Sequence, residues 1–325
     1  MKFKTPITLD ELCGIIGHEV IVAGNKDNLI TGVNEIHSVV KGNISFVDSP
    51  KYYDKALQSE ATVILINKEV DCPEGKTLVV TDDPVNDYIT IVRHFVQFHP
   101  QSELIHPSAK IGEGTIIQPN VFIGEDVVIG KNCVIHANVS IYAHSIIGDN
   151  VIIHSGASIG ADACYFQKRN TGWKKLESCG RVILSDKVEV GANTCIDKGV
   201  SGDTFIGEDV KFDNLVQVGH DTHIGARCLI GAQCGIAGCT YIDDDCSLWA
   251  RSCVNKDLYI AKHTTVLALS AVDKSVKEEG MTLFGQPAID ARKAWRELAS
   301  IRSLPGLLEE FAKLKKEVET LKASK

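Results

Sequence analysis

The chain has 325 residues, eleven cysteines and a formal net charge of −8 at pH 7. This acidic balance argues against nucleic-acid binding as a property of the whole chain. The N-terminus has no secretory h-region, and no window of about 18 apolar residues suggests a transmembrane segment. We therefore expect a soluble, cytoplasmic protein with two or more folding units.

Residues 1–100 are predicted to form a small α/β domain. Strand-like runs such as ATVILI (61–66) and TLVVT (77–81) precede the amphipathic stretch NDYITIVRHFVQF (86–98). Alternating strand and helix patterns of this length favour an α/β fold. The polar stretch HPQSELIHPSAK (99–110) is predicted to be the linker to the next domain.

A six-residue repeat fills the middle of the chain. Every sixth residue from Ile111 to Ile159 is isoleucine. The frame returns as Leu184, Val190 and Ile196, slips by four residues, and then places a large apolar residue at every sixth position from Ile206 to Val272. The residue two places earlier is mostly small or β-branched. The period of six excludes an amphipathic helix, whose period is 3.6.

One large and one small residue per six fit a narrow prism of short parallel strands. Glycine often follows the large residue, and we expect it to relieve the turn sterically. The pattern resembles the hexapeptide-repeat family, whose fold is a left-handed parallel β-helix with three hexads in each 18-residue coil. The resemblance implies a mainly β domain of about eight coils over residues 106–272.

Two interruptions break the repeat, and solenoids often carry functional loops at such breaks. Residues 161–181 are polar and contain Trp173, so we expect an excursion loop there. The second break is the slip in DKGVSGD (197–203). A loop that leaves one coil can cover a groove on a neighbouring subunit, although a tolerated insertion would look the same.

His220, in DNLVQVGHDTHIG (213–225), is the candidate catalytic residue. It is two residues after Val218 in its hexad, which places it on the outside. One coil of 18 residues further on is Gly238. A base beside a backbone N–H can remove a proton and stabilise an oxyanion together. An exposed surface histidine is the simpler alternative. His223 also faces outward, but no third ligand is evident, so no metal site is predicted.

Residues 287–325 are predicted to form two helices. Pro305 and Gly306 end the first, and the second carries apolar residues spaced 4, 3, 4 and 3. This spacing is typical of a coiled-coil seam, here Leu307, Phe311, Leu314, Val318 and Leu321. Because the seam is short, it is weak alone. A three-sided prism with such a seam favours self-association, so we predict a homotrimer.

The cysteines are explained largely by the repeat. Cys133, Cys228, Cys234 and Cys246 occupy the small position of their hexads, where Thr, Ser, Ala or Val stand elsewhere. Free cysteine packs as a small hydrophobe. An odd number of cysteines and the absence of a CxxC pair argue against a disulfide framework and a zinc site. Cys239 and Cys253 have no such explanation.

Longer stretches resemble one particular family. They include ISFVDSPKYYDKAL (44–57), HPSAKIGEGTIIQPNVFIG (106–124), GRVILSDKVEVGANTCIDKGVSGDTFIGEDVKFDNLVQVGH (180–220) and FGQPAIDARKAWRELASI (284–301). Together they are similar to UDP-3-O-(3-hydroxyacyl)glucosamine N-acyltransferases of lipid A biosynthesis. The likeness covers nearly the whole chain in the right order, and its two ends lie outside the generic hexapeptide pattern.

This resemblance implies transfer of a 3-hydroxyacyl chain from acyl carrier protein to the 2-amine of a UDP-3-O-acylglucosamine. No cofactor would be bound, because 4′-phosphopantetheine arrives on the carrier. His220 falls on the family's catalytic base and Gly238 on the backbone donor to the oxyanion. The polar run before the histidine, Asp213, Asn214 and Gln217, would orient the base or the sugar.

The resemblance also implies binding residues in the flanking parts. Phe46 and Tyr52 match two aromatics that sandwich uracil, giving residues 1–100 a uridine-binding role, although ordinary core or surface aromatics would look alike. Arg292, Lys293 and Arg296 offer a basic patch for an acidic carrier protein, or simply a solvated helix face.

Four departures from the family pattern leave the substrate open. Ala163 lies in GADACYF where the family commonly has GADGFGF, and Ser49 replaces an asparagine between the uracil-stacking aromatics. Asp257 stands where a second active-site histidine is expected. Ala271 stands where we expect a bulkier side chain in the region that sets acyl-chain length. These substitutions are compatible with a divergent member or paralogue of the family that uses a different sugar or a longer or branched acyl chain.

Two other classes of function fit the same repeat. One is an acetyl-CoA-dependent N-acetyltransferase of a nucleotide amino sugar, which the FVDSPKY segment disfavours. The other is a catalytically silent scaffold or a metal-dependent hydratase. An N-acylation assay with acyl carrier protein and with acetyl-CoA separates them.

Overall fold

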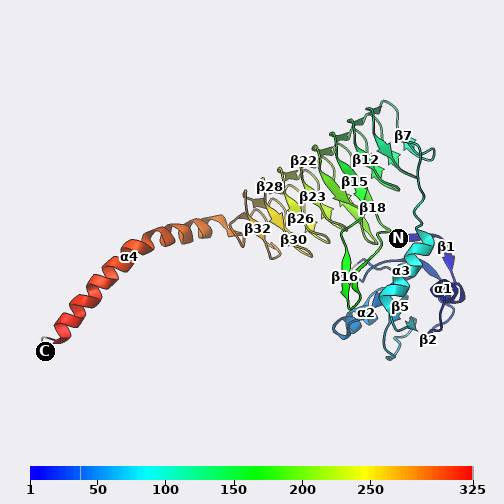
Figure 1. Ribbon diagram of the computed structural model, residues 1–325, viewed down its shortest axis with the longest axis horizontal. Coiled ribbons are helices and arrows are strands. Elements are labelled where there is room, and N and C mark those ends of the chain that lie inside the picture. Colours follow the sequence, from blue (N-terminus) through cyan, green and yellow to red (C-terminus); the bar gives the residue numbers. More distant parts are fainter. Residues whose placement is uncertain (37, 324–325) are drawn as a thin grey trace.

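The computed structural model describes residues 1–36 and 38–323, in three parts (Figure 1). An N-terminal α/β domain lies beside a long stack of short strands, and a single helix leaves the far end of the stack. This order agrees with the expected fold class. Among the described helices, none combines the length and apolar character that a membrane span requires.

The N-terminal domain is a six-stranded mixed sheet in the order β1-β3-β4-β5-β6-β2. Its strands β3 to β6 run parallel, and the all-buried sequence of β5 suits a strand covered on both faces. A capping box of Thr8 and Glu11 starts α1, and Asp83 caps α3. The elements are β1 (Lys2–Ile7), α1 (Leu9–Ile16), β2 (Ile21–Gly24), β3 (Ile30–Val33), β4 (Asn43–Val47), the 3₁₀ helix η1 (Pro50–Tyr52), α2 (Tyr53–Gln58), β5 (Val63–Ile66), β6 (Thr77–Val80) and α3 (Pro84–Phe95).

The repeat forms a parallel β-solenoid with three faces. Successive hexads occupy successive faces, so residues one coil apart pair in register, as Ile129 does with Ile111 and Ile147. From Ile123 onward the predicted large apolar positions are buried and form one core. The first face has β7 (Lys110–Ile111), β10 (Val128–Ile129), β13 (Ile146–Ile147), β18 (Arg181–Leu184), β21 (Asp203–Ile206), β24 (His223–Ile224), β27 (Tyr241–Ile242) and β30 (Tyr259–Ile260).

The second face has β8 (Ile116–Ile117), β11 (Val134–Ile135), β14 (Ile152–Ile153), β19 (Glu189–Val190), β22 (Lys211–Phe212), β25 (Leu229–Ile230), β28 (Ser247–Leu248) and β31 (Thr265–Val266), followed by β33 (Thr282–Phe284) and β34 (Ile289–Asp290). The third face has β9 (Phe122–Ile123), β12 (Ser140–Ile141), β15 (Ser158–Ala161), β20 (Cys195–Asp197), β23 (Gln217–Val218), β26 (Gly235–Ile236), β29 (Cys253–Val254) and β32 (Ala271–Val272).

The stack is slightly longer than the eight coils predicted. Each face has eight hexad strands, but β33 adds a parallel strand to the second face and β34 pairs with it antiparallel. The solenoid therefore continues past residue 272. Leu283 has no six-residue predecessor in the sequence, yet it is buried in the same core, and for this reason the repeat alone missed it.

We expected the glycine after each large apolar residue to relieve the turn, but the positive-φ residue of the turn is a different one. One residue in nearly every turn, three places before the buried apolar residue, has positive φ, and Asn or Asp takes ten of these nineteen non-glycine positions. The glycine after the apolar residue is needed for another reason. A Cβ added to Gly130 would lie 2.6 Å from the backbone of Gly148 in the next coil. Close approach of the coils, and not the turn, selects glycine there.

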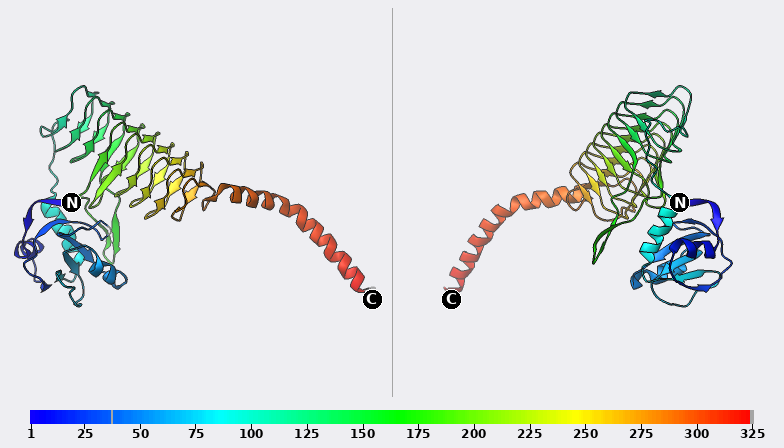
Figure 2. Two further views of the ribbon diagram at one scale, coloured as in Figure 1. Left: turned by 180° about the vertical axis from the view of Figure 1, so that it is seen from behind. Right: turned by 45° about the vertical axis from the view of Figure 1, so that its right-hand side comes forward.

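The C-terminal part is one helix, α4 (Ala291–Ala323), and not two. Figure 2 shows it curving away from the end of the solenoid. Pro305 lies inside it. Proline removes one backbone donor and bends a helix, but an exposed helix can continue through it with a kink. The predicted break at Pro305 and Gly306 is therefore wrong.

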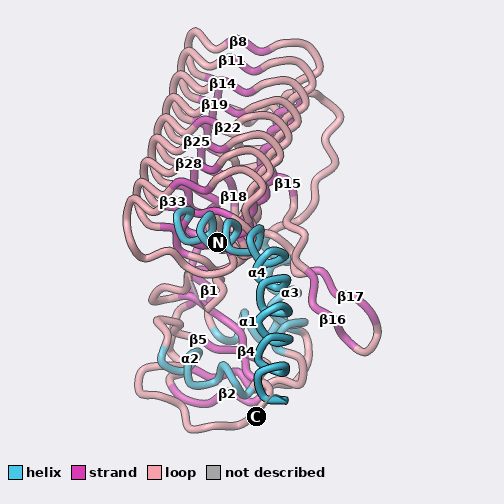
Figure 3. The backbone as a smooth tube through the Cα atoms, turned by 90° about the vertical axis from the view of Figure 1, so that its left-hand side faces the viewer, coloured by secondary structure: helices cyan, strands magenta, loops and turns pink. Residues whose placement is uncertain are grey.

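The excursion at 161–181 is an antiparallel hairpin of β16 (Phe166–Arg169) and β17 (Gly172–Lys175). Figure 3 shows it projecting from the side of the stack. It contacts the N-terminal domain of the same chain, where Arg169 pairs with Asp48 at 3.2 Å and Lys174 donates to Asn86 at 2.6 Å. The N-terminal domain consequently lies beside the middle coils.

Candidate functional site

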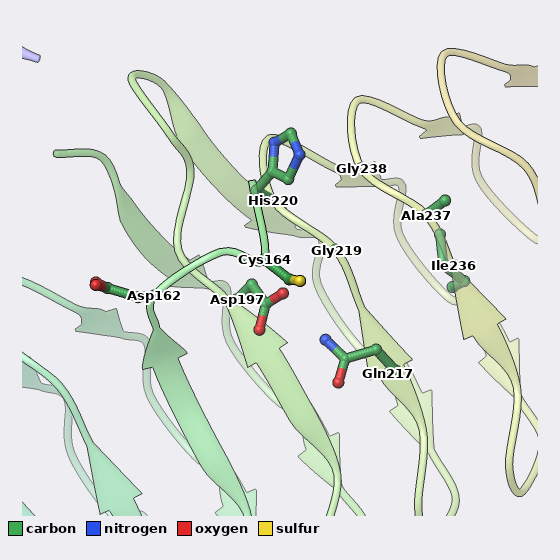
Figure 4. Close-up of a pocket in the computed structure, with 9 residues that line it drawn as sticks. All are labelled: Asp162, Cys164, Asp197, Gln217, Gly219, His220, Ile236, Ala237 and Gly238. Atoms are coloured by element: carbon green, nitrogen blue, oxygen red, sulfur yellow. The ribbon is translucent and has the colours of Figure 1, made fainter. Parts of the chain in front are cut away.

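A cavity of about 370 Å³ opens where several third-face strands end. Its lining residues belong to β20, β23 and β26 or to the segments that follow β15, β23 and β26, and Figure 4 labels all of them, His220 included. The cavity thus lies between the middle coils and the start of the hairpin. It is lined by Asp162, Cys164, Asp197, Gln217, Gly219, His220, Ile236, Ala237 and Gly238.

His220 is held by its neighbour Asp221. The side chains are 13% and 4% exposed, and Nδ1 lies 2.9 Å from Oδ2 of Asp221. Because a carboxylate only accepts hydrogen bonds, Nδ1 carries the proton in the neutral ring and Nε2 keeps a lone pair. This leaves Nε2 available as a base.

The slip at 197–203 explains how Asp221 is held. Its carboxylate accepts hydrogen bonds from the backbone N–H of Val200 at 2.8 Å and of Gly202 at 2.9 Å, both in the slipped segment. Sequence reasoning singled out this segment but missed Asp221. The signal was present in the turn pattern, since Asp221 occupies one of the positive-φ turn positions.

Gly238 lies directly against the imidazole. A Cβ at this position would be 2.6 Å from Nε2 of His220, closer than two such atoms can approach. The N–H groups on either side, of Ala237 and Cys239, donate to Val254 and to His220. Among the described hydrogen bonds, the N–H of Gly238 donates to no acceptor. Base and backbone donor are therefore adjacent, as predicted from the 18-residue spacing.

Opposing effects set the pKa of His220. Burial alone would lower it, but the hydrogen bond and charge of Asp221, with the charges of Glu35 and Asp197, raise the pKa above its ordinary value. For Asp221, burial would raise the pKa, but the bonds from His220, Val200 and Gly202 hold it lower. The pair therefore favours a charged imidazolium once a proton has been accepted.

Comparisons with known proteins agree over most of the chain. Residues 27–94 match the family described as UDP-3-O-(3-hydroxymyristoyl) glucosamine N-acyltransferase, LpxD. Residues 203–238 match bacterial transferase hexapeptide repeats, and residues 100–200 match the GMPPB C-terminal domain. The UDP-3-O-acylglucosamine N-acyltransferase of Delftia acidovorans is 33% identical over 326 residues, which cover 96% of each chain. The chain belongs to this N-acyltransferase family.

Another relative and a solved structure support the assignment. UDP-3-O-acylglucosamine N-acyltransferase 1 of Sulfurimonas denitrificans is 39% identical over 83% of this chain and 90% of its own. The structure of LpxA, a UDP-N-acetylglucosamine acyltransferase from Bacteroides fragilis, superposes with a TM-score of 0.53 at 27% identity. It covers 59% of this chain and 74% of its own.

Within this N-acyltransferase, only part of the predicted polar run lines the cavity. Gln217 does, and its amide donates to the carbonyl of Val218 at 3.3 Å. Asp197 also lines the cavity, and burial raises the pKa of its carboxyl group. Asp213 and Asn214 instead lie at an exposed turn. Asn214 accepts from the N–H of Ala192 at 2.7 Å, so it ties neighbouring coils together.

The two aromatic residues predicted to stack on uracil have different surroundings. Phe46 is half-buried against Tyr88, with ring centroids 4.6 Å apart. Tyr52 is exposed, and Lys51 lies over its ring at 5.3 Å. Among the described ring contacts, none joins Phe46 to Tyr52. Between them, Ser49 precedes η1 without a side-chain capping bond.

The predicted carrier-binding residues Arg292, Lys293 and Arg296 are all exposed in the first turns of α4. Their neighbours Ala291 and Ala294 are buried against the end of the solenoid. The basic side chains therefore form a fixed outer face at the base of this helix, separate from its free C-terminal part.

The remaining departures from the family pattern can also be placed. Ala163 is buried, and its N–H donates to Ser178 at 3.2 Å. Asp257 occupies a positive-φ turn one coil beyond Cys239, and its N–H donates to the carbonyl of Gly238 at 3.3 Å. Ala271 is half-buried on the third face, paired with Cys253. Asp257 therefore stays near the cavity through its backbone.

All eleven cysteines are free. Those at the small hexad positions are buried, as expected. Cys239 occupies a positive-φ turn, and its Sγ lies 4.0 Å from Nδ1 of His220.

Metal binding at this cluster is not favoured. Ligand atoms of His220, Asp221 and Cys239 lie within 4.8 Å of one another. However, burial raises the pKa of the Cys239 thiol to about 12, and backbone N–H groups already occupy the Asp221 carboxylate. A hydrogen-bonded network fits this cluster better than an ion.

Proposed function

We propose that this N-acyltransferase moves a 3-hydroxyacyl chain from acyl carrier protein to the 2-amine of UDP-3-O-(3-hydroxyacyl)glucosamine, in lipid A biosynthesis. Family membership supports the reaction class. The observation that carries the catalytic assignment is the contact between Nε2 of His220 and Gly238 inside one cavity. A base and an unused backbone donor are the two groups that acyl transfer to an amine requires.

The proposed step begins with attack of the sugar amine on the thioester carbonyl. Nε2 of His220 takes a proton from the amine as the C–N bond forms. The N–H of Gly238 donates a hydrogen bond to the resulting oxyanion. Collapse of this intermediate breaks the C–S bond, and the imidazolium returns its proton to the thiolate of 4′-phosphopantetheine. Asp221 stabilises the imidazolium in between, as a carboxylate does in other histidine-based sites.

Substrate and partner binding complete the proposal. Phe46 and Tyr52 would hold the uracil, and the position of the N-terminal domain beside the middle coils supports this. Arg292, Lys293 and Arg296 would receive the acidic carrier protein, because complementary charge steers association. A homotrimer in the cytoplasm is the proposed working form, and the exposed apolar positions of α4 support self-association.

An N-acylation assay tests this proposal. Purified protein, UDP-3-O-acylglucosamine and 3-hydroxyacyl carrier protein should give an N-acylated product, whose acyl group mass spectrometry identifies. Acetyl-CoA in place of the carrier should give none. His220→Ala should lower kcat by about 10²-fold or more, the usual loss when a general base is removed. No product with the carrier, or full activity of the variant, would refute the assignment.

The pH dependence has a definite sign. His220 acts as a base only when neutral, so kcat/KM should rise with pH as the imidazole loses its proton. Because the pKa is raised, the midpoint of that rise should lie above 6.5.

A further inference from the structure

A tyrosine from the hairpin lies against the proposed catalytic base. The ring of Tyr165 has its centroid 4.8 Å from that of His220, with the planes inclined by 44°. Tyr165 is half-buried and immediately precedes β16. Its position in the family motif, GADACYF against GADGFGF, is one that commonly has glycine. The sequence repeat gave no indication of this contact.

Tyr165 is itself fixed at its far end by the N-terminal domain. Its hydroxyl donates to Oε1 of Glu35 at 3.1 Å, and Glu35 is 7% exposed. The N–H of Glu35 donates to Oγ of Ser201 at 3.0 Å. Ser201 lies between Val200 and Gly202, the residues that hold Asp221. One segment therefore supports both contacts of the imidazole.

The packing around Tyr165 makes this arrangement rigid. Its ring contacts a buried apolar cluster that includes Val85 and Ile89 of α3, together with Ala163, Leu176 and Val200. The cluster joins the N-terminal domain, the hairpin and the solenoid. A single hydrogen bond to Asp221 would let the imidazole pivot about that bond. A packed ring at its side removes much of this freedom.

We propose that Tyr165, anchored by Glu35, is a positioning residue that holds the plane of the His220 imidazole so that Nε2 faces the cavity beside Gly238. The proposal rests on the catalytic role proposed for His220. It predicts that the aromatic ring matters for turnover, because misplacement of a catalytic group by a fraction of an ångström slows reaction without weakening binding. Loss of the Tyr165 hydroxyl should affect turnover less, because the hydroxyl only anchors the ring and does not itself contact His220.

Kinetics of three variants test the positional role. Tyr165→Leu keeps apolar volume in the cluster but loses the ring, and should lower kcat about tenfold with little change in KM. Tyr165→Phe keeps the ring and should retain kcat within about threefold. Trp173→Leu, at an exposed position of the same hairpin, is the matched control and should match the unmodified protein. Wild-type kcat in Tyr165→Leu, or an effect confined to KM, would overturn the proposal.

A second measurement does not require turnover. Diethyl pyrocarbonate modifies neutral imidazole, so the pH dependence of His220 modification, followed by peptide mass spectrometry, reports its pKa. The groups facing His220 are Asp221, Asp197, Glu35, the Cys239 thiol and the Tyr165 phenol. Glu35 raises the pKa of His220, so Glu35→Gln should shift its modification profile to lower pH, and the profile of His223 should not move.

Tyr165→Leu should also speed modification of His220 at high pH, because the ring shields one side of the imidazole. Unchanged rates and profiles in both variants would overturn the positioning role. If the unmodified protein fails to N-acylate the sugar but these changes in modification occur, the contact of Tyr165 with His220 is supported and the proposed substrate is wrong. The two failures are thus distinguishable.

Discussion

At the scale of single residues, Gly238 is a tightly constrained position of the site. Its Cα faces Nε2 of His220 so closely that a methyl group cannot be added without moving the ring or the turn. Gly219, in the preceding coil, meets the same restriction against the backbone N of Gly238, at 2.6 Å. The close approach of His220 and Gly238 therefore depends on two glycines in adjacent coils.

Gly238→Ala should consequently abolish most activity. The added Cβ displaces His220 and disturbs the backbone donor, so we expect kcat to fall by about 10²–10³-fold, the range for loss of an oxyanion-hole donor. Steady-state kinetics with a circular-dichroism melting curve measure this and separate it from unfolding. Gly238 lacks positive φ, so alanine is allowed by the backbone itself.

Gly235→Ala is the matched control for that variant. Gly235 lies in β26 of the same coil, and nothing is within 4 Å of an added Cβ. Its activity and melting temperature should remain near those of the unmodified protein. Equal losses in the two variants would show that the effect is general damage to the coil.

At the scale of elements, the hexads were predictable and the hairpin contacts were not. The repeat is a local pattern, because a buried apolar residue recurs at every sixth position. Strands and coils could therefore be placed from the sequence alone. The contact of Tyr165 with Glu35 joins residues 130 positions apart and has no local signature. His220 and Gly238 were found because their separation equals one coil. Asp221 was missed because its role depends on Val200 and Gly202, across the slip.

The hairpin should act as a strap between the N-terminal domain and the solenoid. Asp48 accepts from Gln167 and Arg169 of β16, both at 3.2 Å, with side chains of Arg169 and Asp48 only 29% and 25% exposed. Asp48→Asn should weaken this contact by about 1 kcal/mol, as for a partly exposed ion pair. The released hairpin should then be cleaved about fivefold faster by trypsin after Lys168 or Arg169, as judged by mass spectrometry of the fragments.

Glu208→Gln is the control for Asp48→Asn in the trypsin experiment. Glu208 pairs with Lys187 at 2.6 Å on the solenoid surface, away from the hairpin. Its removal should leave the cleavage rate unchanged. If Asp48→Asn also leaves the rate unchanged, the ion pair does not fasten the hairpin.

At the scale of the whole molecule, the N-terminal domain lies beside the solenoid and α4 lies at its end (Figure 1). The N-terminal domain and the hairpin meet the solenoid at its middle coils, where the cavity opens, and α4 extends from the far end (Figure 1). The basic residues at the base of α4 are therefore separated from the cavity by the last coils. A carrier protein docked there would deliver its flexible phosphopantetheine arm along the solenoid.

The free part of α4 should stabilise the proposed trimer. Leu307, Phe311, Leu314, Val318 and Leu321 are 41–67% exposed in the single chain, although they form an apolar seam. Leu314→Asp combined with Val318→Asp should lower trimer stability, because each fully buried side chain of this size contributes about 1.5–3 kcal/mol. Sedimentation equilibrium should then show dissociation at concentrations where the unmodified protein has about three times its chain mass of 35.3 kDa.

A matched pair of aspartates outside the seam isolates the cause of this dissociation. Ala312→Asp with Lys316→Asp adds the same number of carboxylates at the same i, i+4 spacing, on helix positions that the seam does not use. Because it also removes a lysine, it adds more negative charge than the seam pair and is the stricter control for charge. This variant should remain trimeric at every concentration where the unmodified protein does. Equal dissociation of both variants would mean that added charge, and not the lost apolar contact, drives the chains apart. A monomeric unmodified protein would remove the basis for the trimer altogether.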